Sequence, residues 1–228
     1  MVKSRRSVQS APSVRAPKQD RSRASFERVL DAAAKLMVER GYAGFTLGDV
    51  VKRAKVSIGS IYGRVDSKDE LIRAVQQRVM ARMELEQADM VTRLRRRALS
   101  LPDLISAIVK ELASFLQENA AVLNSFIERA RADNVVMLFG RQAYGHTLLD
   151  FKLLLLERRS EIRPADADHA AEVCFDVVYS ALARHFGVGS IPGSASQGDL
   201  DTLIVDLSAV CLAYLTGPQP ARPHIARK

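Results

Sequence analysis

The feature that most constrains the fold is a pair of short helices expected within residues 46–62. Thr46 and Asp49 have the spacing of a capping box, and the apolar positions that follow predict a helix ending near Lys55. Ser57 is expected to cap a second helix of little more than one turn. Two helices joined by about three residues form a helix-turn-helix, whose second helix is short enough to enter a DNA major groove.

Helices are also expected on both sides of this pair. An apolar face at three- and four-residue spacing begins at Phe26, and Gly41 stands where a left-handed residue would end that helix. Ser67 and Glu70 repeat the capping-box spacing and open a long helix. Residues 26–71 are therefore predicted to form one compact helical unit.

The rest of the chain is predicted to be helical as well, and no stretch shows the alternation of a strand. Apolar residues recur at helical spacing over residues 101–118, 120–131, about 134–159, 164–186 and about 200–215. We therefore expect an all-α fold. The last two long helices carry small residues that permit close approach, so we expect them to pair with the same helices of a second copy.

The net charge of +8 is concentrated at the N-terminus. Residues 1–25 hold seven cations and one acid among Ser and Pro, with few large apolar side chains. Such a segment cannot bury enough surface to offset its ordering entropy, which predicts a disordered basic arm. The arm either contacts phosphates or only adds solubility.

Several classes of protein are excluded or disfavoured by what the sequence lacks. Cys174 and Cys211 are too few for a disulfide framework, and no CxxC pair suggests zinc or redox chemistry. No apolar run reaches the roughly 18 residues of a membrane span, and no secretory signal begins the chain. We therefore expect a cytoplasmic protein that has no membrane partner.

Five segments of the N-terminal third stand in a recognisable order and spacing: Leu30-Asp31-Ala32-Ala33, Glu39-Arg40-Gly41-Tyr42, Thr46-Leu47-Gly48-Asp49-Val50, Val56-Ser57-Ile58-Gly59-Ser60-Ile61-Tyr62 and Ser67-Lys68-Asp69-Glu70-Leu71. Together they resemble the N-terminal domain of TetR-family transcriptional regulators. The resemblance implies a homodimer with an N-terminal operator-binding domain and a C-terminal helical domain that dimerises and binds a small inducer.

The resemblance also implies roles for single residues in DNA binding. One set matches positions that contact phosphates or support such contacts: Thr46, Ser60, Tyr62 and Lys68. Another matches the operator-reading side of the recognition helix: Ser57, Ile58, Gly59 and Gly63.

Three residues depart from the family pattern. Lys55 stands where the turn usually has glycine, so a residue with a side chain is expected to adopt positive φ at a cost of about 1 kcal/mol. Ile58 replaces a polar or cationic residue, and it can contact a thymine methyl group but cannot make a bidentate bond to guanine. Gly63 replaces a larger residue that helps to grip the DNA backbone. We therefore expect readout to depend more on shape and phosphates than on base edges.

A ligand pocket is expected between the last two long helices and residues 104–156. Its candidate lining residues are aromatic or apolar, which favours an apolar or aromatic ligand, although any single one could also be an ordinary core residue. The candidates are Phe115, Phe126, Met137, Tyr144 and Tyr179.

The resulting expectation is a ligand-responsive, sequence-specific DNA-binding regulator, most simply a repressor that a small inducer releases from its operator. The expected organisation is an arm at 1–25, a helix-turn-helix DNA-binding domain at 26–71, a ligand-binding and dimerisation domain at 72–217 and a flexible tail at 218–228. Operator DNA, an inducer and a second copy are the expected partners. No cofactor and no enzymatic activity are expected, because no catalytic motif is present.

Two alternatives remain open. The first is a helical-bundle enzyme or metal protein that uses the acidic and histidine side chains of residues 166–172, although acids in a first helical turn are expected from the helix dipole alone. The second is a protein-interaction adaptor with a degenerate helix-turn-helix, which Ile58 and Gly63 would allow.

Overall fold

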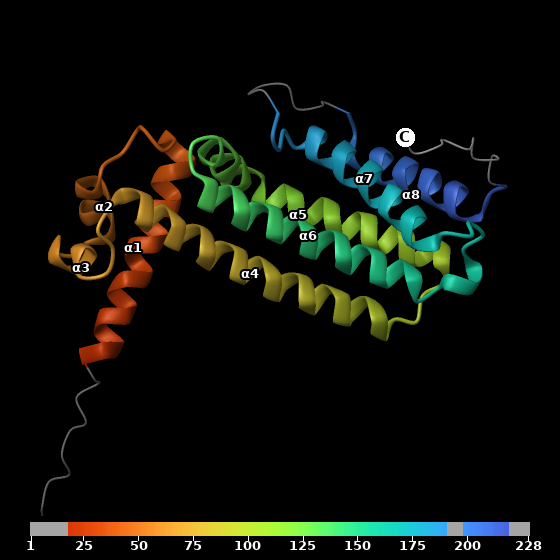
Figure 1. Ribbon diagram of the computed structural model, residues 1–228, viewed down its shortest axis with the longest axis horizontal. Coiled ribbons are helices and arrows are strands. Elements are labelled where there is room, and N and C mark those ends of the chain that lie inside the picture. Colours follow the sequence, from red (N-terminus) through yellow and green to blue (C-terminus); the bar gives the residue numbers. More distant parts are fainter. Residues whose placement is uncertain (1–17, 191–197, 219–228) are drawn as a thin grey trace, which may run out of the picture.

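The computed structural model describes residues 18–190 and 198–218, and this part of the chain is helical without a strand (Figure 1). The expected all-α fold is confirmed. The first 17 residues of the expected arm, and nearly all of the expected tail, lie outside the described residues. The helices are α1 (Lys18–Arg40), α2 (Leu47–Ala54), α3 (Gly59–Tyr62), α4 (Lys68–Arg96), α5 (Leu101–Ala130), α6 (Asn134–Leu156), α7 (Ala167–His185) and α8 (Leu200–Thr216), with a 3-10 turn at Arg159–Glu161.

The first three helices gather around the beginning of α4 (Figure 1). Their shared core contains Val29, Val50, Ile61 and Ile72, which are all fully buried. Gly41 ends α1 with φ of 67°, as the sequence predicted, because glycine adopts the left-handed region without a steric penalty.

Helix α1 begins at Lys18 and not near Phe26, so the expected arm at 1–25 is too long by eight residues. The added segment contains good helix formers such as Lys, Gln, Arg and Ala, and no Gly or Pro interrupts it. The Ser22 hydroxyl accepts a hydrogen bond of 2.9 Å from Arg64, which ties this part of α1 to the end of α3.

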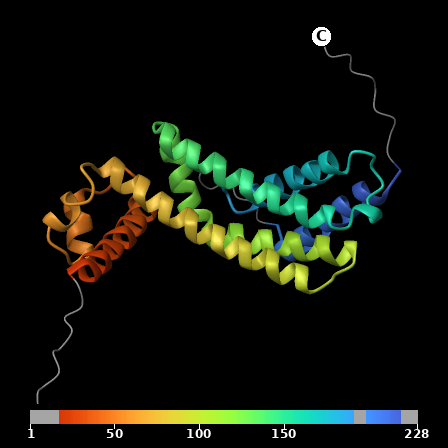
Figure 2. The ribbon, with the colours of Figure 1, turned by 60° about the horizontal axis from the view of Figure 1, so that its bottom comes forward.

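The remaining helices form a bundle in which α5 packs against α6 and α8, and α7 lies between α6 and α8 (Figures 1 and 2). Its centre holds Leu116, Phe175, Val178 and Leu215, none of which is exposed to solvent. The predicted helix at 164–186 begins later, at Ala167, because Pro164 is buried in the preceding loop. None of the described helices is long and apolar enough to cross a bilayer.

One predicted helix break is absent. Residues 101–118 and 120–131 were expected to be separate helices, but α5 runs without interruption from Leu101 to Ala130. Asn119, at the expected break, is buried. Its amide donates to the Phe115 carbonyl (2.8 Å) and accepts from Arg82 of α4 (3.0 Å). A tertiary partner thus satisfies the polar residue that interrupts the apolar pattern.

Helices α4, α5 and α6 each take part in both hydrophobic cores. Helix α4 contributes Leu71 and Val75 to the core of the N-terminal unit and Leu94 to the core of the bundle. Helix α5 contributes Leu116 to the bundle, and its last turns place Phe126 in the N-terminal core. The two units are therefore joined by continuous helices and not by a linker.

Candidate nucleic-acid interface and ligand pocket

The predicted capping box opens α2. The Thr46 hydroxyl accepts from the Asp49 amide (3.2 Å), and the Asp49 carboxylate accepts from the Thr46 amide (2.8 Å). Hydrogen bonds from Thr46 hold the pKa of the Asp49 carboxyl below its ordinary value. The box therefore fixes the first turn of α2.

The turn after α2 contains the left-handed residue that the sequence predicted. Lys55 has φ of 53° and ψ of 51°, and the Val56 amide reaches back to the Val51 carbonyl at 3.3 Å. A side chain in this region costs about 1–2 kcal/mol relative to glycine. The left-handed conformation is therefore maintained by the rest of the folded structure and not by the intrinsic preference of the residue at position 55.

This strain gives a direct stability test. Lys55→Gly is expected to raise the free energy of unfolding by about 0.5–1 kcal/mol, because relief of strain exceeds the added entropy of the unfolded glycine. Urea denaturation measures the change. Lys55→Ala is the matched control and should give no gain, since alanine retains the Cβ atom. Equal gains in both variants would show that strain at φ is not the cause.

Helix α3 presents an exposed surface of small and apolar groups. Ile61 is fully buried and anchors the helix, whereas Ile58 is 47% and Tyr62 is 54% exposed. Ser57, Gly59 and Gly63 are also exposed, and Ser60 is half-buried. The Tyr62 hydroxyl has no hydrogen-bond partner among the described residues. The predicted operator-reading residues are therefore all accessible to solvent.

The expectation that Ser57 caps α3 is wrong. The position before the helix is Ile58, and no side chain caps the first amides of α3. The Ser57 hydroxyl instead lies 2.9 Å from the Ser60 hydroxyl, one turn ahead. Two predicted contact residues thus hold one another in place on the exposed side.

Gly59 is not required by the packing of the protein. Its φ is not positive, and a Cβ atom added to it would meet no atom within 4 Å. An alanine at this helical position would ordinarily be more stable by up to about 1 kcal/mol. A glycine that costs stability on an exposed helix fits a surface that must approach another molecule closely.

Lys68 faces inward, although it belongs to the predicted phosphate-contacting set. Its ammonium donates to the carbonyl oxygens of Tyr42 and Phe45 and lies 4.4 and 4.0 Å from the centres of their rings. Burial lowers the pKa of this amine. Lys68 therefore fastens the loop that carries Thr46 to the start of α4, and a phosphate could reach it only by competing with these partners.

A partly buried ionic network, which the sequence did not reveal, lies where α4, α5 and α6 meet. Arg129 binds Asp69 (3.0 Å) and Asp133 (3.3 Å), and Arg73 binds Asp133 at 3.1 Å. Tyr42 donates its hydroxyl to Asp69. Burial alone would raise the pKa of the Asp133 carboxyl, but hydrogen bonds from Arg73 and from two α6 amides hold it below its ordinary value.

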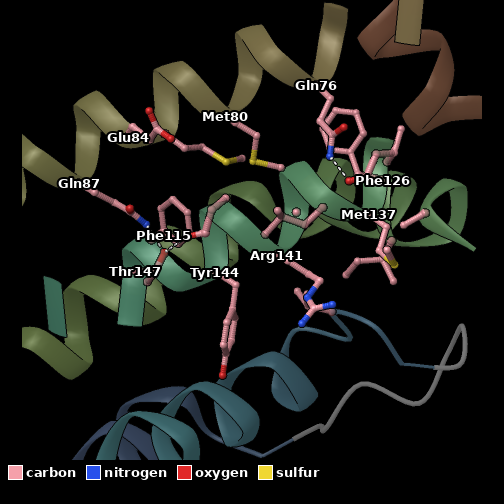
Figure 3. Close-up of a pocket in the computed structure, with 18 of the residues that line it drawn as sticks. Gln76, Met80, Glu84, Gln87, Phe115, Phe126, Met137, Arg141, Tyr144 and Thr147 are labelled. Atoms are coloured by element: carbon pink, nitrogen blue, oxygen red, sulfur yellow. Dashed lines mark hydrogen bonds between the residues drawn. The ribbon is translucent and has the colours of Figure 1, made fainter. Parts of the chain in front are cut away.

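A cavity of about 570 Å³ lies between α4, α5, α6 and α7 (Figure 3). All five residues proposed from the sequence line it: Phe115, Phe126, Met137, Tyr144 and Tyr179. The sequence did not identify the wall formed by α4, because an apolar stripe on a long helix is also typical of simple packing. The side chains of that wall are Gln76, Met80, Met83, Glu84 and Gln87.

The lining is mostly apolar, although it includes the charged side chains of Glu84 and Arg141. Tyr144 donates its hydroxyl to Asp176 at 3.2 Å, and burial together with this carboxylate raises its pKa to about 12. Its ring packs edge-on against Tyr179, with 5.0 Å between ring centres. Gln76 and Gln87 are buried, and each donates a hydrogen bond of 2.9 Å from its side-chain amide to α6. The cavity therefore suits a mostly apolar guest.

The acidic segment considered for metal binding is engaged otherwise. Asp166 caps α7 by accepting from the His169 amide at 3.0 Å. Lys152 binds Asp168 at 2.7 Å and Glu172 at 3.5 Å. Within the described ranges, no three His, Cys, Asp or Glu side chains gather as metal ligands would.

Comparisons with known proteins agree with this arrangement. The sequence profile of "Bacterial regulatory proteins, tetR family" matches residues 29–75, the segment that contains the helix-turn-helix. No curated protein sequence matches the chain significantly.

Solved structures share the fold over most of both chains. A TetR-family transcriptional regulator from Mesorhizobium loti MAFF303099 is 18% identical, with a TM-score of 0.71 over 86% of this chain and 96% of that one. The regulator FadR from Bacillus subtilis, solved with stearoyl-CoA, is 15% identical, with a TM-score of 0.60 over 85% and 100%. A transcriptional regulator from Saccharomonospora viridis, solved with choline, is 14% identical, with a TM-score of 0.62 over 84% and 95%. Residues 29–75 of this chain therefore match the tetR family of bacterial regulatory proteins, and the chain has the fold of TetR-family transcriptional regulators.

Proposed function

We propose that this protein is a cytoplasmic, homodimeric repressor that binds an operator through α3 and leaves it when a small apolar or aromatic inducer occupies the cavity. A ligand-responsive DNA-binding regulator is what the fold implies. The observation that carries the proposal is α4, because this one helix supports the exposed α3 and also forms a wall of the cavity.

DNA contact would rely on backbone approach. The hydroxyls of Ser57, Ser60 and Tyr62 suit phosphate oxygens, and Gly59 lets α3 come close to the groove. Ile58 suits a thymine methyl group. The exposed face of α3 offers no side chain for a bidentate bond to guanine, so DNA shape would supply much of the specificity.

Dimerisation would use α7 and α8. Val177 on α7 and Val205 and Val210 on α8 are between 42% and 65% exposed in the single chain. Apolar groups on two adjacent helices suit a four-helix interface between copies. Such a dimer can place its two α3 helices in successive major grooves, about 34 Å apart.

The coupling between cavity and DNA follows from the position of α4. Leu71 and Val75 lie in the core that supports α3, and Met80 and Met83 follow on the same helix at the cavity. An inducer that prefers a displaced α4 would disturb both α3 helices of the dimer together. A coupling of about 1–3 kcal/mol would lower operator affinity roughly 5- to 150-fold.

The similar structures support a small-molecule ligand but not its identity. One of them binds stearoyl-CoA and another binds choline, so the same fold accepts chemically different molecules. The lining of this cavity, with methionine, phenylalanine and tyrosine side chains, is the reason for expecting an apolar or aromatic inducer.

Selection of bound genomic fragments by the purified protein tests the proposal and also identifies the operator. Enrichment of a palindromic site, followed by a salt-titrated shift assay, is the expected result. Failure to enrich any sequence would favour the adaptor alternative. If a site is enriched but no apolar compound releases the protein from it, the proposed DNA binding would stand and the proposed apolar inducer would be rejected.

The role of Gly59 can be tested separately from folding. Gly59→Ala is expected to leave the thermal midpoint unchanged or slightly higher, and to weaken operator binding at least tenfold, because the added methyl group stands between α3 and the groove. Gly145→Ala on α6 is the matched control, since Gly145 is also exposed and a Cβ atom there also meets no atom within 4 Å. Unchanged operator affinity in Gly59→Ala would show that Gly59 does not lie in the DNA interface.

A further inference from the structure

Two buried glutamines of α4 line the cavity three helical turns apart (Figure 3). Gln87 donates from Nε2 to the Thr147 hydroxyl, and Gln76 donates from Nε2 to the Val136 carbonyl, both at 2.9 Å. Both bonds join α4 to α6. The end at Gln76 is the one nearer the DNA-binding unit, because Val75 beside it belongs to that core.

The orientation of the Gln76 amide is fixed by its partner. A carbonyl oxygen can only accept, so the atom that faces Val136 must be the amide nitrogen. The carbonyl oxygen Oε1 of Gln76 therefore points away from Val136. Within the described part of the chain, Gln76 Oε1 and Arg129 Nε are the buried side-chain polar atoms without a hydrogen-bond partner.

No described residue donates a hydrogen bond to Gln76 Oε1. Gln76 is fully buried, and Met80 and Phe126 lie near it in the cavity lining (Figure 3). Buried acceptors in proteins are almost always paired, and an exception calls for a specific explanation. The explanation that the cavity offers is a donor on the guest.

We propose that the inducer carries a hydroxyl or amide N–H group that donates to Gln76 Oε1, while its apolar part lies against Met80, Met83 and Phe115. This assignment rests on the proposed function, because it concerns the ligand of that same cavity. Gln76 would then be a specificity-determining residue. It would select apolar molecules that bear a donor over those that bear only acceptors or none.

The same contact explains how such a ligand would be sensed. Gln76 already bridges α4 and α6 through Val136, whose amide is bound by Asp133 at 3.3 Å. Asp133 in turn binds Arg73 near the start of α4. A ligand group that donates to Gln76 would therefore bind the same side-chain amide that links α4 to α6 beside the DNA-binding unit.

The test uses two probes that differ in one donor, para-octylphenol and its methyl ether para-octylanisole. Isothermal titration of each into the full-length protein should show about tenfold tighter binding of the phenol. Simple hydrophobic partitioning would favour the ether, so this preference cannot come from apolar burial. Gln76→Leu should abolish the preference. Gln87→Leu, the same change at the other end of the cavity, should retain it.

The outcomes separate the two proposals. Equal binding of both probes to the unaltered protein, or a phenol preference that survives Gln76→Leu, would overturn the role of Gln76 and leave the apolar cavity as a ligand site. Binding of neither probe would overturn the apolar-ligand assignment and this inference with it. If Gln76→Leu does not fold, Gln76→Met serves in its place, and the two probes on the unaltered protein still decide.

Discussion

Tyr62→Ala is expected to weaken operator binding by about 30- to 150-fold while leaving the thermal midpoint nearly unchanged. The side chain is 54% exposed on α3, so its removal costs little packing. Loss of one hydroxyl–phosphate bond costs about 1–1.5 kcal/mol. A symmetric dimer loses it twice, which gives about 2–3 kcal/mol and the stated range of affinity.

Two further variants define what Tyr62 contributes. Tyr62→Phe removes only the hydroxyl, so it should reproduce most of the loss if the phosphate bond dominates. Leu85→Ala changes a side chain that is 70% exposed on α4, away from α3, and should leave affinity unchanged. Shift assays on the selected operator measure all three. Affinity within twofold of the unaltered protein in Tyr62→Ala would show that this face does not touch DNA.

Asp133→Ala is expected to lower the free energy of unfolding by about 3–5 kcal/mol, a large part of the stability of an ordinary domain. The Asp133 side chain is only 1% exposed, and it pairs with Arg73 and Arg129. It also accepts from the Val135 and Val136 amides and so caps α6. Its removal leaves buried donors without their acceptor.

Asp133→Asn separates charge from shape. The amide retains an acceptor oxygen for the helix cap, so the loss should be clearly smaller than in Asp133→Ala. The pH dependence gives a second check. The pKa of Asp133 is lowered on folding, so its stabilisation is complete at neutral pH and is lost below about pH 4, as the carboxyl becomes protonated. A difference between the unaltered protein and Asp133→Ala that persists undiminished at pH 2 would contradict this account.

Local features of the fold could be predicted from the sequence because their causes are local. Thr46 and Asp49 form the predicted capping box, and Lys55 adopts the predicted left-handed conformation. Both depend on hydrogen bonds and sterics within a few residues. The five aromatic and apolar cavity residues were placed near one another because α5, α6 and α7 show clear apolar faces.

Features that depend on distant partners could not be predicted. The inward position of Lys68 requires the carbonyls of the loop before α2, and Asn119 remains within α5 because Arg82 of another helix binds it. The network around Asp133 joins residues sixty positions apart. Charged residues at helix ends ordinarily face solvent. The sequence alone therefore favours a solvated position for most of these side chains.

The continuity of α4 and α5 has a consequence for how the protein unfolds. The expected boundary at residues 71 and 72 lies in the first turns of α4, and the N-terminal core is completed by Phe126 and Val136 from α5 and α6. Neither unit can lose its structure without fraying helices on which the other depends. The division between reading DNA and sensing a ligand is therefore one of function only. We therefore expect the two units to unfold together in a single cooperative transition.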